Sequence, residues 1–534
     1  MTTILTILYS VIALVAIINI CVELKRDLMM LQQNSYRNER YTKWLRVSGD
    51  TTSTIRLCGY AALLFSISTI GIEIVSMTFI AIIAAVNSYK LITARYKKPL
   101  VMTARARRIF AVSLLISAVC LAAVPVFANN VNLCRLVALF TFVALGVFLF
   151  SHVILMLANI ILRPVESHIN NGYRKDAERI LASMPGLKIV GITGSYGKTS
   201  TKHYLHRILS EQFDTCMTPG SYNTTLGVIR TIREYLKPYN EVFIVEMGAK
   251  QTGDIKEIAE LVHPTIGIVT AVGEQHLESF KTIENVANTK FELVDSLPAD
   301  GIAVINDDFE PIASRKVDGC NVIRYGISNP GNARFTATQI SYGADGTHFT
   351  LKGSNGTEIE LHTRLVGECN VSNLIAAIIV ALELGVPEAK IKYAVDKIEQ
   401  VDHRLQVKRT PAGITILDDA FNSNPTGSSM AVDVLSKMTS GKRIIITPGM
   451  IELGERQSEL NRIFGEKIAA GADVAIIVGH YNRDAILDGI KAGGMDMANV
   501  HAVDSFNEAQ AFLQTFVKTG DTVLYENDLP DTFK

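Results

Sequence analysis

Neither sign of charge is in excess in this sequence. It carries 52 basic and 52 acidic residues among 534, so no overall positive field favours binding to nucleic acid. Cysteine is also sparse: the seven cysteines are scattered and form no CxxC pair, which argues against a disulfide framework or a zinc knuckle. The sequence has no repeat of solenoid period and no low-complexity tract, so we expect packed domains.

Apolar residues are abundant near the beginning of the chain. The mean hydropathy is +0.24, which is high for a soluble protein. One almost uncharged run, long enough to cross a bilayer, covers residues 3–22. Two shorter runs, broken near Gly71 and Glu73, lie within residues 57–92. Two further apolar runs cover residues 109–127 and 136–162. We therefore predict a multi-pass α-helical membrane region over 1–165 with about five helices. Buried core helices are the alternative for the two shorter runs.

The loop charges predict an orientation for this region. Basic residues crowd the segments 23–56 and 90–108, whereas 128–134 carries no charge. Basic loops stay in the cytoplasm, so we expect the N-terminus outside, the later domains in the cytoplasm and the protein in the cytoplasmic membrane. The first residues lack the basic stretch of a removable signal peptide and other apolar runs follow, so we expect the first run to be retained.

From about residue 187, short apolar runs alternate with amphipathic stretches. The runs 188–193, 241–248, 265–273 and 301–307 have the pattern of buried strands, and 200–210, 254–262 and 283–296 that of helices. This alternation predicts an α/β domain over 166–410 with a mostly parallel sheet. Turn pairs at 345–346 and 355–356 predict a small antiparallel insertion near 320–365. A second series of strands predicts a smaller α/β domain over 411–534.

One loop has the composition of a phosphate-binding site. It lies between a predicted strand and a predicted helix and reads TGSYGKTS, residues 193–200. Glycines let backbone N–H groups turn toward phosphate oxygens, and the helix presents its positive end. Lys198 would offset phosphate charge and Thr199 could ligate Mg²⁺. The first glycine of the usual P-loop is replaced by Ile192, so a glycine turn without a ligand is the alternative.

Polar residues at the ends of the next strands indicate one common edge. Glu246 follows four apolar residues in the run 241–248, at the carboxyl edge of the predicted strand, and His276 follows the run 265–273 in the same way. Ligands bind outside the carboxyl ends of parallel strands, so we expect Glu246, His276 and Thr199 to converge on metal-bound phosphates. Each residue taken alone could instead be an ordinary surface residue.

Together these motifs resemble the Mur ligase family, and within it the branch that adds D-alanyl-D-alanine. The resemblance covers roughly 185–530 and includes the loop at 193–200 and the segments GSYNTTLGVIRTI, EMGA, QHLESF, TKFELVDSLP, INDD, GECNVSN, DHRLQ and DDAFNSNP. It implies a central P-loop ATPase domain followed by a Rossmann-like C-terminal domain. It also implies an ATP-dependent ligase that uses Mg²⁺ and joins an amino group to a cell-wall precursor carboxylate through an acyl phosphate.

The resemblance further implies roles for individual residues. ATP would be bound by Thr193, Gly194, Ser195, Gly197, Lys198, Thr199, Ser200, Asn306, Asn370, Asn373, Arg404, Asp419 and Asn422. Mg²⁺ would be bound by Thr199, Glu246, His276 and Lys290.

Lys290 would act as a carbamate made with CO₂, an oxygen-bearing anion suited to Mg²⁺. Lys198, His276, Lys290 and Arg404 would be the catalytic set, and Asn223 would contact the substrate. An ordinary surface lysine is the alternative for Lys290. The family's histidine before Asn370 is Cys369 here, so no role is carried over to that position.

Two segments depart from the family pattern. Predicted membrane helices stand where D-alanyl-D-alanine-adding enzymes have a uridine-binding domain, and the segment 525–533 is acidic where they have a basic stretch. The expected partners are the bilayer, a UDP-linked or lipid-linked muramoyl-peptide precursor, and a small amino-acid or dipeptide amine donor. The helices could merely anchor the enzyme, or they could mark a ligase for a lipid-linked acceptor with a different donor.

Two other classes of protein are weighed as alternatives. A folylpolyglutamate-synthase-like enzyme would share the ligase core, but EMGA and DDAFNSNP argue against it. A non-enzymatic, ATP-binding membrane regulator would have lost metal or nucleotide residues, whereas Glu246, His276, Lys290 and Arg404 are all present.

Overall fold

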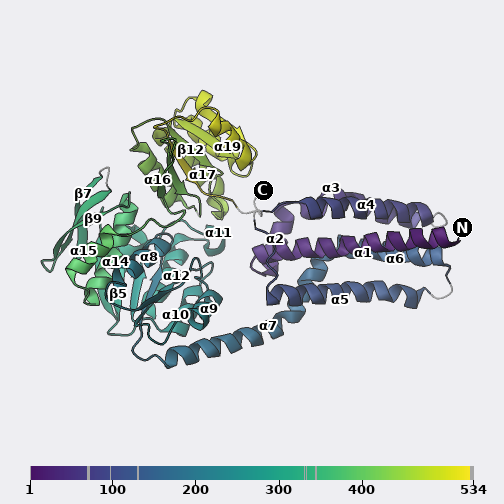
Figure 1. The fold of residues 1–534 in the computed structure, drawn as a ribbon, viewed down its shortest axis with the longest axis horizontal. Helices are drawn as coiled ribbons and strands as arrows, with labels where there is room; N and C mark the ends of the chain where they lie inside the picture. Colours follow the sequence, from purple (N-terminus) through teal and green to yellow (C-terminus); the bar gives the residue numbers. More distant parts are fainter. Residues whose placement is uncertain are drawn as a thin grey trace. The chain divides into compact units, whose positions relative to one another are not determined.

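The computed structural model describes residues 2–68, 73–96, 98–128, 131–329, 331, 333–342, 346–421 and 423–529. It divides into a helical N-terminal unit, residues 1–170, and an α/β unit, residues 171–528 (Figure 1). The N-terminal unit contains the elements α1 (Thr2–Gln33), α2 (Asn38–Val47), η1 (Asp50–Thr52), α3 (Thr54–Ser68), α4 (Glu73–Thr93), α5 (Ala104–Phe127), α6 (Leu133–Leu149) and the first part of α7 (Ser151–Ala182).

Long apolar helices form the N-terminal unit. Among the described residues, three helices are long and apolar enough to cross a membrane, namely α1, α4 and α5. The pair α6 and α7 is bent by 69° and would make a fourth span, whereas α3 is a shorter apolar helix. In the most apolar 18 residues of each of the helices α1, α4 and α5, only 22–39% are buried, so most apolar side chains there face outward, as in a lipid environment. The count of five helices and their orientation stay predictions.

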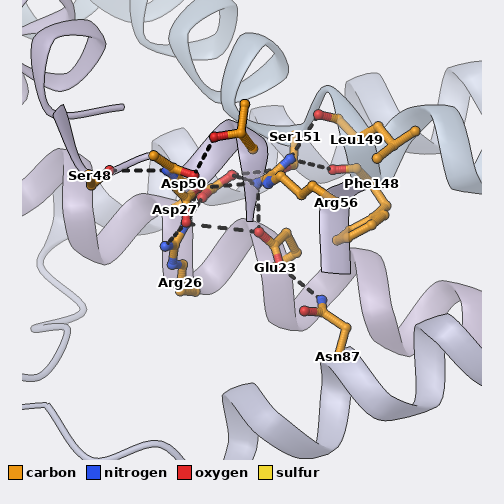
Figure 2. A network of polar contacts seen from close by, with 12 residues as sticks. Glu23, Arg26, Asp27, Ser48, Asp50, Arg56, Asn87, Phe148, Leu149 and Ser151 are labelled. Atoms are coloured by element: carbon orange, nitrogen blue, oxygen red, sulfur yellow. Dashed lines mark hydrogen bonds and ion pairs between the residues drawn. The ribbon is translucent and has the colours of Figure 1, made fainter. Parts of the chain in front are cut away.

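A buried polar network joins these helices (Figure 2). Arg56 on α3 is 2% exposed and donates hydrogen bonds to Glu23 Oε1 on α1 at 2.7 Å and to the Leu149 carbonyl at the end of α6 at 2.8 Å. Asp27 on α1 accepts a hydrogen bond from Ser151 Oγ, at the start of α7, at 2.7 Å. The network therefore holds both sides of the break between α6 and α7.

The central sheet lies in the α/β unit and has nine strands in the described part of the chain, in the order β2-β3-β1-β4-β5-β6-β7-β8-β9. The strands are β1 (Lys188–Thr193), β2 (Thr215–Met217), β3 (Val242–Glu246), β4 (Ile266–Val269), β5 (Ile302–Asn306), β6 (Asn321–Gly326), β7 (Phe335–Tyr342), β8 (Thr347–Gly353) and β9 (Glu358–Thr363). The helices are α8 (Lys198–Leu209), α9 (Thr225–Glu234), α10 (Asp254–Val262), α11 (Leu277–Phe280), α12 (Ile283–Asp295), α13 (Glu310–Ala313), α14 (Glu368–Glu383) and α15 (Glu388–Asp396).

Helices cover both faces of this sheet, which explains the uninterrupted apolar runs. Successive strand residues point to opposite faces. Ile189 on β1 and Phe243 on β3 therefore lie in one core with α10 and α12, while Val190 and Ile244 lie in the other with α8 and α14 (Figure 1). The parallel α/β fold predicted from the alternation is confirmed.

The segment 320–365 departs in part from its prediction. β7, β8 and β9 pair antiparallel as expected, but β6 pairs in parallel with both β5 and β7. The chain passes from β5 to β6 through α13 and not through a hairpin, and such a crossover returns the next strand in the same direction. Asp345, in one of the two predicted turn pairs, lies outside the described residues.

A second sheet forms the C-terminal part of the α/β unit, in the order β10-β11-β15-β12-β13-β14. Its elements are β10 (Gln406–Arg409), β11 (Thr415–Asp419), α16 (Pro425–Ser436), β12 (Arg443–Thr447), η2 (Gly454–Arg456), α17 (Gln457–Gly471), β13 (Val474–Val478), α18 (Arg483–Ala492), η3 (Met497–Asn499), β14 (Val500–Val503), α19 (Phe506–Gln514) and β15 (Thr522–Glu526). All pairs are parallel except β10 with β11. β10 precedes the boundary that we placed at 411, and the domain bounds stay predictions.

Candidate active site

The glycine loop connects β1 to α8 and is held by its own neighbours. Gly197 has a φ of +81°, and a Cβ there would lie 2.4 Å from Asn373 Oδ1, so only glycine fits. Ser195 Oγ donates to the Gly273 carbonyl at 3.1 Å. Thr193 Oγ1 donates to the Met247 carbonyl at 3.0 Å. These two side chains tie the loop to the segments that follow β4 and β3.

Lys198 begins α8 and folds back over the loop. Its ammonium group donates hydrogen bonds to the carbonyls of Gly194 and Ser195. Burial lowers the pKa of Lys198 to about 8, against the opposing effect of Glu246. A phosphate group would offer this ammonium a stronger partner than two neutral carbonyls.

Glu246, at the carboxyl end of β3, is the centre of a buried cluster. Oε1 accepts hydrogen bonds from Thr199 Oγ1 at 3.2 Å and from Asn223 Nδ2 at 3.0 Å. Oε2 lies 2.9 Å from the ammonium of Lys202. Burial alone would raise the pKa of Glu246, but Lys202 and Lys198 outweigh burial and hold the pKa below its usual value. The structure thus joins Thr199, Glu246 and Asn223, three of the residues singled out in the sequence.

Lys290 and His276 form the next part of the site. Lys290 on α12 is 1% exposed, and its Nζ lies 5.9 Å from the centroid of the Phe280 ring. Burial, and then repulsion from Lys198, lower the pKa of Lys290 well below its usual value. His276 precedes α11, and its Nδ1 is hydrogen-bonded to Glu452 Oε2. None of the contacts described for these residues joins His276 or Lys290 directly to Glu246.

A metal site among these residues would need donors other than acidic, cysteine and imidazole side chains. Within the described ranges, no group of three or more His, Cys, Asp and Glu residues lies close enough to hold a metal ion. Glu246 and the Thr199 hydroxyl do offer two adjacent oxygen donors, the type that Mg²⁺ prefers. A neutral Lys290 amine is also the form that can react with CO₂. The donor chemistry of these residues fits the predicted metal.

A cavity of about 210 Å³ lies beside the glycine loop. Its lining includes these predicted nucleotide residues: Gly197, Ser200, Asn306, Asn370, Asn373, Arg404 and Asp419. Cys369 also lines it. Thr193, Gly194, Ser195, Lys198 and Thr199 lie outside its lining, so the loop borders the cavity only through Gly197, Ser200 and Tyr196. Asn422 lies outside the described residues.

The asparagines of the cavity wall are hydrogen-bonded within the protein. Asn306 Nδ2 donates to the Thr270 carbonyl at 2.9 Å. Asn370 Oδ1 accepts from the Tyr204 hydroxyl at 2.8 Å. Asn306 Nδ2 also donates to Ser372 Oγ at 3.0 Å, so both of its N–H groups are used within the protein. These bonds fix the direction of each amide and leave only part of its hydrogen-bonding capacity for a ligand.

Acidic groups also line the cavity. Asp419 and Glu526 end the adjacent strands β11 and β15 in register. Burial raises the pKa of Asp419 to about 6, although Arg404 opposes this shift. Glu526 is fully buried, and its Oε1 accepts hydrogen bonds from Ser423 and Ser428, both at 2.7 Å. The Arg404 guanidinium stacks on Phe421 at 4.3 Å.

Comparison with known proteins agrees with this arrangement. Residues 192–381 match the Mur ligase middle domain, and residues 403–525 match the Mur ligase, glutamate ligase domain. A UDP-N-acetylmuramoyl-tripeptide–D-alanyl-D-alanine ligase from Mycobacterium bovis is 31% identical over 366 residues, which cover 64% of this chain and 70% of that protein. The chain belongs to the Mur ligase family.

Other Mur ligases differ in how much of their length is matched. The ligase of the same name from Bacillus subtilis is 28% identical over 286 residues, which cover 53% of this chain and 61% of that protein. The chain thus spans about three fifths of that relative. A crystal structure of MurF ligase from Thermotoga maritima in complex with ADP has a TM-score of 0.60 and 25% identity and covers 67% of this chain and 80% of that one.

Three residues of this Mur ligase site were missed in the sequence. Lys202 lies four positions after Lys198 on α8, a spacing that places both on one helix face and could have indicated it. Glu526 ends a strand, as Glu246 does, so the same edge rule could have found it. Glu452 lies in the segment TPGMIELGE, residues 447–455, which resembles a strand and loop of the same family branch, but its contact with His276 arises only through the fold.

Proposed function

We propose that the chain is an ATP-dependent ligase that joins an amino group to the carboxylate of a muramoyl-peptide precursor, with D-alanyl-D-alanine as the amine donor. One observation carries the proposal: an anion loop, a buried carboxylate cluster and a nucleoside-sized cavity adjoin one another through Gly197, Lys198 and Thr199. Membership of the Mur ligase family and the names of its relatives support the reaction.

Different side chains bind the nucleoside and the phosphates of ATP. The cavity lined by Asn306, Asn370 and Asp419 takes the nucleoside, and the positive charges of Lys198 and Arg404 face the phosphates. Because the Lys198 ammonium donates to two neutral carbonyls in this structure, it is ready to exchange them for a phosphate. The substrate carboxylate attacks the γ-phosphorus and yields an acyl phosphate and ADP.

The second half of the reaction forms the amide bond. The amine attacks the acyl carbon, the C–O bond to phosphate breaks, and phosphate leaves. The residues contribute position and charge, which supply much of the rate in phosphoryl transfer. Bound Mg²⁺ would offset phosphate charge in the first half. Thr199, Glu246 and His276 would hold it, together with Lys290 once its neutral amine has captured CO₂.

Membrane attachment is part of the proposal. The three apolar helices α1, α4 and α5 precede the ligase domains in the same chain, so the reaction takes place at the cytoplasmic membrane face. These helices also favour a second candidate, a ligase for a lipid-linked acceptor with a different amine donor. A soluble UDP-linked acceptor needs no such helices, whereas a lipid-linked one is confined to the membrane.

Phosphate release from ATP by detergent-purified protein tests both candidates. D-alanyl-D-alanine or single amino acids are combined with UDP-linked or lipid-linked peptide acceptors. Release that requires D-alanyl-D-alanine and a UDP-linked tripeptide supports the first candidate, and release only with a lipid-linked acceptor supports the second. Lys198→Ala should abolish release, whereas Lys316→Ala, at a lysine that is 88% exposed, should not. No release with any pair would refute both.

A further inference from the structure

Glu452 connects the C-terminal sheet domain to the predicted metal ligand His276. It lies on the loop between β12 and η2, and its carboxylate is hydrogen-bonded to Nδ1 of His276. The same loop makes two more contacts with the segment 274–278. The backbone N–H of Glu278 donates to the Glu452 carbonyl at 3.2 Å, and Arg456 pairs with Glu274 at 2.9 Å. The imidazole contact is therefore part of a docked loop.

Both partners adopt an unusual backbone conformation. His276 has a φ of +54° and Glu452 a φ of +64°, in the left-handed region that non-glycine residues seldom occupy. Such a conformation is unfavourable for a residue with a Cβ and persists only where the surrounding structure enforces it. Such strain gathers at functional sites, and here it accompanies a direct contact between the two side chains.

The contact determines which imidazole nitrogen can bind a metal. A carboxylate accepts hydrogen bonds, so Nδ1 must carry the proton and Nε2 is left with its lone pair. Histidines that bind metals commonly donate their other N–H group to a carboxylate, which fixes the ring and makes the free nitrogen a better ligand. Glu452 provides this carboxylate from a different domain.

We propose that Glu452 is a positioning residue that prepares His276 as a metal ligand, so that the metal site of the central domain is complete only when the loop 450–456 is docked. The inference rests on the proposed function, because it takes His276 to be a ligand of Mg²⁺. By linkage, metal binding and docking of the loop then favour each other. The C-terminal domain thereby acts on the metal as well as on the nucleotide.

Binding of Mn²⁺ to the full chain tests the role without relying on turnover. Free Mn²⁺ is measured by electron paramagnetic resonance with a non-hydrolysable ATP analogue present. Glu452→Ala should weaken Mn²⁺ binding about tenfold, the loss typical of a removed ligand partner. Glu452→Gln keeps an acceptor for the Nδ1 proton and should lose less. Glu455→Ala removes an exposed carboxylate from the same loop and should bind Mn²⁺ as the parent chain does.

Steady-state kinetics separate positioning from a merely structural role. In Glu452→Ala the KM for Mg²⁺ should rise, while kcat at saturating Mg²⁺ should stay near that of the parent chain. Unchanged Mn²⁺ affinity in Glu452→Ala, or an equal loss in Glu455→Ala, would overturn the inference. A parent chain that never releases phosphate would refute the proposed function, yet the Mn²⁺ measurement would still decide the role of Glu452. If Glu452→Ala does not fold, the comparison of Glu452→Gln with Glu455→Gln decides.

Discussion

Replacing Arg56 by methionine tests whether the buried polar network holds the N-terminal unit together. The guanidinium of Arg56 donates hydrogen bonds to Glu23 and to the carbonyl of Leu149, and it also forms an ion pair with Asp27 (Figure 2). Methionine keeps much of the apolar stem but removes every donor. Two carboxylates that are at most 4% exposed would then lose this cation.

The size of the effect follows from what stays paired. Breaking a buried ion pair by removing one partner costs about 3–5 kcal/mol. Glu23 still accepts a hydrogen bond from Asn87 at 2.9 Å. Asp27 still accepts hydrogen bonds from Ser151 at 2.7 Å and from Arg26 at 3.0 Å. These bonds place the expected loss of unfolding free energy at the lower end, about 3 kcal/mol.

The only tryptophan in the sequence makes this loss measurable in one unit. Trp44 lies on α2, is 8% exposed and stacks on Tyr41, so its fluorescence during denaturation of the full chain in mild detergent reports on the N-terminal unit alone. Arg46→Met is the matched control, because Arg46 is an exposed arginine of the same unit, on the helix α2 that also carries Trp44. Stability of Arg56→Met within about 0.5 kcal/mol of the control would refute the reasoning.

Three further predictions concern the α/β unit. Gly197→Ala places a Cβ 2.4 Å from Asn373 Oδ1 at a φ of +81°. The left-handed conformation alone costs about 1–2 kcal/mol, so calorimetry should show ATP affinity reduced by at least about tenfold. The pKa of Asp419 is about 6, and protonation of its carboxylate removes a hydrogen-bond acceptor from the cavity wall. ATP affinity should therefore fall as the pH drops below about 6. In Asp419→Asn this pH dependence should vanish. Lys202→Met leaves Glu246 buried without its cation, so thermal denaturation should show a loss of about 3–5 kcal/mol, which Lys256→Met, at an exposed lysine, should not share.

The fold was predictable from the sequence wherever burial leaves a regular pattern. β1 begins and ends at the residues that its apolar run indicates, 188–193, and α10 at those of its amphipathic stretch, 254–262. β1 is buried from Ile189 on, whereas α10 buries one face and exposes the other, so the composition of each element reflects its position. The direction of β6 was not predictable in this way. Pairing direction depends on the path of the connecting chain, which passes through the short helix α13 and leaves no periodic pattern.

The candidate site shows the same division between local and long-range information. Gly197 and Lys198 were predictable because one short loop determines their geometry, and Glu246 because it ends a strand. Glu452 was not, because it lies 176 positions from His276 and the contact exists only once two domains have folded together. Groups proposed to face the ligands were thus easier to predict from the sequence than the groups that orient them.

The lysines of the site explain why a modified Lys290 suits this arrangement. Lys290 is buried and Lys198 is half-buried, and the charge of Lys198 disfavours a second ammonium beside it. A neutral Lys290 removes this repulsion and is at the same time the form that reacts with CO₂. The resulting carbamate would place an anion near Lys198, whose present partners are two carbonyls of its own loop. Carbamylation should therefore help to draw Lys198 away from Gly194 and Ser195, and bicarbonate should strengthen ATP binding in the parent chain but not in Lys290→Ala. Equal ATP affinity with and without bicarbonate in the parent chain would contradict this reasoning.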